Sequence, residues 1–124
     1  MGFDLRVIKI EEFFHTDARD APIDLEAAYG LLRRVVRETT ERGIYRVMID
    51  ARGNPTGLSV ADMFELVGDF QRYGLTPDHR VALLRARPEA LERARYLETL
   101  ATARGFNVRA FAEFEEALDF LNES

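Results

Sequence analysis

Apolar and polar residues follow one another along the chain in two alternating patterns, one typical of strands and the other of helices. Short runs rich in branched apolar side chains predict strands at 5–10, 44–50, 81–84 and 106–111. A stretch with apolar residues three and four positions apart follows each run or the loop after it, which predicts a helix. We therefore predict one α/β domain over residues 1–124, a mainly parallel sheet of four to five strands with helices on both faces and the first strand at or near an edge.

Residues with preferences for helix ends mark where these helices begin and end. Asp24 and Ser59 precede the first two helices, and their side chains can accept hydrogen bonds from free backbone amides. Pro88 suits a first helical position, and Gly43 suits the residue after a last turn. The second helix carries five apolar residues that we expect to face the core or, alternatively, to line a pocket for an apolar ligand: Val60, Met63, Phe64, Val67 and Phe70.

Residues 13–22, before the first helix, form a polar, turn-like segment after two aromatic residues. If the segment is extended, the adjacent rings of Phe13 and Phe14 point in opposite directions. One ring could then form a dimer contact, or the first helix and the following loop cover both. His15 lies near two aspartates, but an ordinary loop histidine explains it without a bound metal.

Charge and composition narrow the function classes. The formal net charge of −5 argues against binding of nucleic acid, whose phosphates would be repelled. The absence of cysteine excludes disulfides, thiolate metal sites and cysteine nucleophiles. Residues 1–10 lack the uninterrupted apolar stretch of a signal peptide or a membrane span, so we expect a cytoplasmic protein without membrane insertion.

Familiar catalytic patterns are missing from the sequence. It contains no nucleophile elbow around a serine and no glycine-rich phosphate loop. Neither histidine has a second nitrogen or sulfur ligand nearby in the sequence. We therefore expect no enzyme activity, no cofactor and no metal.

The loops that follow the predicted strands are the places where ligands of such sheets usually bind. Arg52, Arg85 and Arg87 lie in two of these loops and, with the helix start at Pro88, could hold an anionic ligand. The alternative is solvated surface charge balanced by neighbouring carboxylates.

The loop Asn54-Pro55-Thr56-Gly57-Leu58 resembles the STAS domain of anti-sigma-factor antagonists, where this loop reads Asp-Ser-Ser/Thr-Gly-Leu. Asn54 stands in place of the aspartate and Pro55 in place of a serine. The order of elements is similar along most of the chain, and the carboxyl half is most similar to the SpoIIAA-like branch of that superfamily. The resemblance implies a STAS-like fold.

The resemblance also implies a regulatory role. In the family, the hydroxyl residue before Gly-Leu is phosphorylated by a partner kinase, and Thr56 matches that position; Ser59 is a second candidate phosphoacceptor. We expect a protein partner, a regulatory kinase or a sigma-factor regulator, and possible formation of a homodimer. The residues expected to bind the partner are Asn54, Gly57, Leu58 and Met63. The alternative is a domain that binds a lipid or an anion between the sheet edge and the second helix.

Overall fold

Five strands form one sheet in the order β1-β2-β3-β4-β5. The computed structural model describes residues 4–8 and 13–123. β1 pairs antiparallel with β2, and the remaining neighbours pair in parallel. This confirms a mainly parallel sheet with the first strand at an edge; residues 9 and 10 of the first predicted strand lie outside the described residues. The strands are β1 Asp4–Ile8, β2 Phe13–Asp17, β3 Arg46–Asp50, β4 Arg80–Leu84 and β5 Asn107–Phe111.

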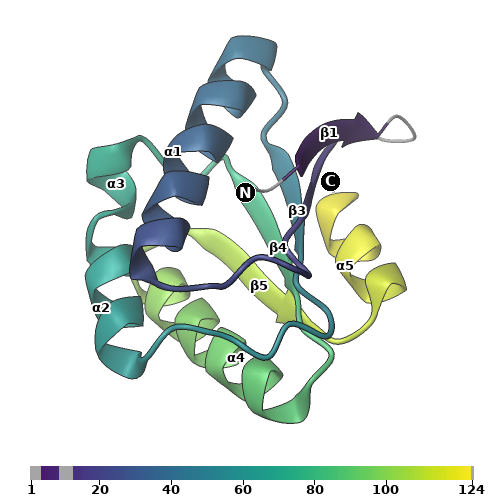
Figure 1. Cartoon of the computed structure of the whole chain (residues 1–124). Coiled ribbons are helices and arrows are strands. Elements are labelled where there is room, and N and C mark those ends of the chain that lie inside the picture. Colours follow the sequence, from purple (N-terminus) through teal and green to yellow (C-terminus); the bar gives the residue numbers. More distant parts are fainter. Residues whose placement is uncertain (1–3, 9–12, 124) are drawn as a thin grey trace.

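Helices cover both faces of the sheet, as predicted (Figure 1). Because β2 to β5 follow one another in both sequence and space, right-handed crossovers place the connecting helices on the same face. These are α1 (Leu25–Arg42), α2 (Val60–Gly68), the short α3 (Phe70–Tyr73) and α4 (Pro88–Ala103). Among the helices of the described residues, only the terminal α5 (Phe114–Leu121) covers the opposite face (Figure 1). In the part of the chain that the structure describes, no helix has the length and apolar character needed to cross a membrane.

The predicted helix ends are confirmed. Asp24 accepts a hydrogen bond from the amide of Ala27 at 2.8 Å, and Ser59 accepts one from the amide of Asp62 at 3.1 Å. Gly43 follows α1 with a φ of 67°, a left-handed conformation that favours glycine.

The prediction of a turn-like segment after Phe13 and Phe14 is wrong for residues 15–17, because β2 continues to Asp17. Phe13 and Phe14 are each 2% exposed and point to opposite faces: Phe13 packs against α5, and Phe14 packs against the layer of α1, α2 and α4. His15 is a buried strand residue rather than a loop residue. Since both rings are covered, neither is available for a dimer contact.

The orientation of α2 differs from the prediction at two positions. Met63 and Val67 are buried as expected, but Val60 and Phe64 are 55% and 54% exposed. Phe64 comes directly after the buried Met63, so its side chain points away from the core. Val60, the first residue of α2, lies one turn before Phe64 and faces the same exposed side.

Along the outer edge of the sheet, a side chain pairs with one backbone amide of β5. The amide of Ala110 donates to Oε1 of Glu98, a residue of α4, at 2.8 Å. An edge strand normally leaves such amides to solvent.

His79 is a buried histidine held in a neutral form. The amide of Thr76 donates to Nδ1 at 3.1 Å, so the ring proton belongs on Nε2, which lies 2.9 Å from the hydroxyl oxygen of Thr39. That hydroxyl donates in turn to the carbonyl of Val35 at 2.7 Å. Burial lowers the pKa of His79 below 6.5.

Acidification below pH 6.5 is therefore expected to destabilise the protein through His79. The unfolded state binds the proton at about pH 6.5 and the folded state only at lower pH, so the free energy of unfolding falls by up to about 1.4 kcal/mol per pH unit in that window. Urea unfolding at pH values from 7.5 to 5 measures this slope, and the His79→Gln variant should have a flatter one. Equal slopes in the two proteins would contradict the assignment.

Candidate functional site

The loop that follows β3 is held in place by the buried side chain of Asn54, which is 2% exposed. Its Nδ2 donates to the carbonyls of Ala18 and Ala21 at 2.7 Å each, which ties this loop to the one after β2. Its Oδ1 accepts from the amide and the hydroxyl of Thr56 at 2.9 and 2.6 Å. Arg85, which follows β4, also holds this loop: its Nη2 donates to the carbonyls of Asn54 and Thr56 at 3.1 and 2.7 Å. The loop is therefore a rigid structure with few free polar groups.

The two predicted phosphoacceptors have different surroundings. The hydroxyl of Thr56 is half-buried, donates to Asn54 and accepts from the amide of Ile23 at 2.7 Å. Ser59 is exposed and caps α2. A phosphoryl group on Thr56 would have to break two hydrogen bonds within the fold, whereas one on Ser59 would stay at the surface. Phosphorylation of either residue stays a prediction, which mass spectrometry of peptides covering 52–62 would test.

Three of the four residues predicted to bind a partner have buried side chains: Asn54, Leu58 and Met63. Gly57 is half-buried. A partner at this surface would instead contact the exposed side chains of Val60 and Phe64, which sequence reasoning assigned to the core.

The three arginines predicted to hold an anion lie in three different environments. Arg52 folds back on Asp50, and its guanidinium lies over an aromatic ring of α5. Arg85 lies on the opposite face, beneath the loop that it supports. Arg87 is exposed and pairs with a carboxylate of α4 at 3.3 Å.

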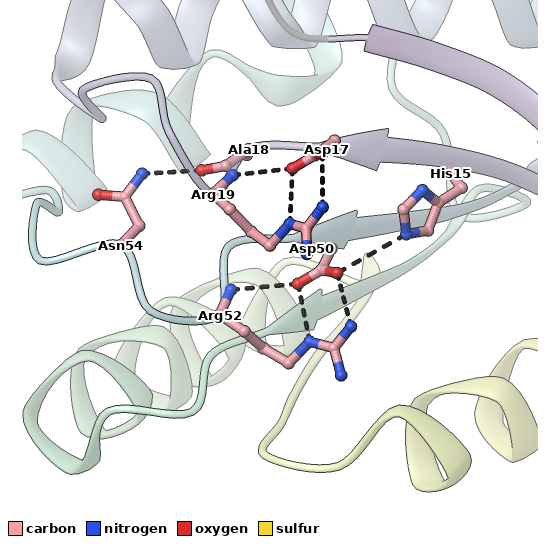
Figure 2. A network of polar contacts seen from close by, with 7 residues as sticks. All are labelled: His15, Asp17, Ala18, Arg19, Asp50, Arg52 and Asn54. Atoms are coloured by element: carbon pink, nitrogen blue, oxygen red, sulfur yellow. Dashed lines mark hydrogen bonds and ion pairs between the residues drawn. The ribbon is translucent and has the colours of Figure 1, made fainter.

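Two copies of the same turn lie side by side on the α5 face, where β2 and β3 end (Figure 2). In each, an arginine donates through its amide, Nε and Nη2 to the aspartate two residues earlier. The distances are 3.1, 3.0 and 2.9 Å for Arg19 and Asp17, and 3.1, 3.0 and 2.8 Å for Arg52 and Asp50. This pair of turns was not predicted, although Asp-Ala-Arg is repeated in the sequence where each of the two strands ends.

Asp50 is the more deeply buried of the two aspartates. Burial disfavours its charged form, but the hydrogen bonds from Arg52 outweigh this effect, so the pKa of the Asp50 carboxyl is lowered. Nε2 of His15 lies 3.8 Å from Oδ2 of Asp50 (Figure 2). Among residues 4–8 and 13–123, no three His, Asp or Glu side chains are grouped to hold a metal ion.

A cavity of about 170 Å³ lies on the other face of the sheet, beneath α1, α2 and α4. The loops after β2, β3 and β4 line one end of it, including Thr56, Gly57 and Arg85. A ligand was predicted between the sheet edge and the second helix, but no pattern in the sequence predicts the cavity itself.

No family model and no curated protein matches the sequence. Solved structures do match it. The unphosphorylated form of the anti-sigma factor antagonist SpoIIAA is 15% identical, with a TM-score of 0.55, over 99% of this chain and 100% of that chain. The phosphorylated form of SpoIIAA from Bacillus gives 16% and 0.55, over 95% and 97%. An uncharacterised DUF3478 protein with a SpoIIAA-like fold from Shewanella loihica PV-4 gives 17% and 0.57, over 97% and 93%. The chain therefore has a SpoIIAA-like fold.

Proposed function

We propose that the protein is a non-catalytic regulatory module that docks a protein partner through the start of α2. The observation that carries this proposal is the pair Val60 and Phe64, two large apolar side chains that are more than half exposed one helical turn apart. Together with the exposed loop residues Pro55 and Ser59, they form what we call the α2 patch. Clustered exposed apolar side chains are typical of interaction sites.

The hydrogen-bonded loop that precedes α2 favours binding at the α2 patch. The hydrogen bonds of Asn54 and Arg85 hold the loop before the patch in one conformation, so little conformational entropy is lost when a partner binds. Asp62 and Glu65 flank the apolar pair on α2. We infer a partner with an apolar groove and a basic rim, because opposite charges around an apolar centre favour correct docking.

The comparison with SpoIIAA supports a regulatory role, since that protein is an anti-sigma factor antagonist known in unphosphorylated and phosphorylated forms. By analogy, we propose a cytoplasmic partner of this chain among sigma-factor regulators or their kinases. A phosphoryl group on Ser59, next to Val60, would add about −1.5 to −2 charge beside the α2 patch and weaken docking of an apolar surface.

Replacing both Val60 and Phe64 with aspartate is expected to weaken partner binding at least 30-fold, because buried aromatic anchors contribute about 2 kcal/mol or more at interfaces. A photo-crosslinking residue at position 64, introduced in cells of the source organism, identifies the partner. Calorimetric titration of the purified partner then measures the dissociation constant.

Tyr96→Asp is the control, since it also replaces an exposed aromatic residue with aspartate, on another helix. Its dissociation constant should stay within threefold of the unmodified protein. If the double variant kept its melting temperature and its affinity, docking through the α2 patch would be refuted.

Small-molecule binding is a second candidate function, because the apolar cavity beneath α1, α2 and α4 offers space for a ligand. Met63 and Leu66 of α2 line the cavity, whereas the apolar pair Val60 and Phe64 of the α2 patch faces solvent outside it. Pro55 is the one patch residue that also lines the cavity. The two functions can therefore be separated by mutation.

A further inference from the structure

The centre of the sheet is incompletely covered on its helical face. Ile49 in β3 and Leu83 in β4 are only half-buried, although both belong to central strands. Their neighbours Met48 and Ala82, which point to the α5 face, are completely buried. The difference arises because the side chains of Ile49 and Leu83 border the cavity.

Away from the loops, the walls of this cavity are apolar. Its volume of about 170 Å³ slightly exceeds that of an apolar protein cavity of about 150 Å³ that binds benzene. By that comparison, it accommodates an apolar group of roughly six to eight carbon atoms. Side chains from three helices and the sheet line it, among them Leu31, Val35, Met63, Ala94, Leu97 and Val81.

Positive charge gathers at the end formed by the loops. Arg85 and Arg93 both line the cavity there, and Arg93 is exposed. A methyl group built on Gly57 would lie 3.9 Å from Nη1 of Arg93, which places this guanidinium beside the rigid loop. Glu89 lines the same end, but its carboxylate already accepts a hydrogen bond from Arg87.

Neither of these two arginines has a carboxylate partner within 4 Å among the described residues. Nε of Arg85 is also buried without a hydrogen-bond partner in the part of the chain that the structure describes. Burial and the nearby charge of Arg93 lower the pKa of Arg85. An anion at this end would relieve the repulsion between the two guanidinium groups.

We propose that the cavity binds an amphiphile with a short alkyl tail and an anionic head group, a medium-chain carboxylate or phosphate ester, with Arg93 contacting the head group. The tail fills the space above Ile49 and Leu83, and the head group lies at the loop end. Arg85 adds positive charge while it continues to support the loop. This proposal rests on the second candidate function and adds the ligand class and the residue that recognises it.

Calorimetric titration of the full chain with octanoate, octyl phosphate, octanol and octylamine tests the proposal. We expect saturable binding of octanoate or octyl phosphate, with a dissociation constant below about 1 mM for ten to thirteen non-hydrogen atoms. The tighter of the two anions identifies the head group. Octanol should bind more weakly and octylamine more weakly still, because the entrance is positively charged.

Two kinds of variant separate the head group from the tail. Arg93→Gln should weaken binding of the anion about tenfold and change octanol binding less than twofold, since it removes charge and leaves the cavity intact. Ala94→Leu on α4, or Ala28→Leu on α1, should abolish binding of every probe by filling the cavity from either wall. Thermal unfolding shows which variants remain folded.

Three results would overturn the proposal: no saturation by either anion up to several millimolar, unchanged affinity in both folded cavity-filling variants, or equal loss of anion and octanol binding in Arg93→Gln. The variant with aspartate at positions 60 and 64 should bind the anion normally, because both residues lie outside the cavity. Failure of ligand binding is therefore distinguishable from failure of partner docking.

Discussion

Replacing Asn54 with alanine is expected to lower the free energy of unfolding by about 3 kcal/mol. The change removes four hydrogen bonds and leaves the carbonyls of Ala18 and Ala21 and the amide of Thr56 without this partner. A buried polar group left without a partner costs about 1–3 kcal/mol, and part of the loss is recovered when water enters the site. Urea unfolding at pH 7 measures the effect.

Asn54→Asp sharpens this test, because aspartate keeps the acceptor and replaces the two donors. At pH 7 its carboxylate would face two carbonyl oxygens, so the loss should equal or exceed that of Asn54→Ala. Asn107→Ala is the control: this exposed asparagine donates a single hydrogen bond, to Pro77, and its loss should cost less than about 1 kcal/mol. Similar losses at positions 54 and 107 would show that the Asn54 network does not stabilise the loop.

Asp50→Asn is the second change with a large expected effect, about 2–3 kcal/mol of unfolding free energy. The repeated turn supplies its control, because Asp17→Asn alters the same hydrogen bonds at a more exposed position. The side chain of Asp50 is 2% exposed, against 26% for Asp17, so the Asp17 pair is screened by water and should contribute less than about 1 kcal/mol. Chemical unfolding of both variants at pH 7 gives the comparison, and equal losses would contradict it.

The stabilisation by the Asp50–Arg52 pair is expected to depend on pH. Because the pKa of Asp50 is lowered, the unfolded state binds the proton before the folded state does. Its stabilisation is present above about pH 3.8 and is lost as the pH falls below that value. Asp50→Asn should therefore reduce the difference in stability between pH 5 and pH 2.

Local signals explain why much of the fold could be predicted. Helix ends at Asp24, Ser59 and Gly43 depend on hydrogen bonds and backbone angles within a few residues, so they can be inferred from neighbouring residues. The parallel sheet follows from the alternation of strands and helices. The loop that carries the resemblance was located correctly for the same reason.

Long-range contacts explain why the other features of the fold and the site could not be predicted. β2 contains His15 and Asp17, polar residues that suggested a turn; the strand tolerates them because Asp50 from β3 lies beside His15 and Arg19 binds Asp17. Asn54 was expected at the surface, but its partners come from the loop after β2, more than 30 residues away. The cavity depends on how far three helices stand from the sheet, which no local pattern records.

Glu98 has a consequence for the ways in which two chains can meet. Its carboxylate accepts the hydrogen bond from the amide of Ala110, so this donor is not available to an incoming strand for main-chain pairing along β5. An added strand would have to displace the carboxylate first. Growth of the sheet from one molecule into the next is thereby disfavoured on that side, and recognition is directed to surfaces formed by side chains.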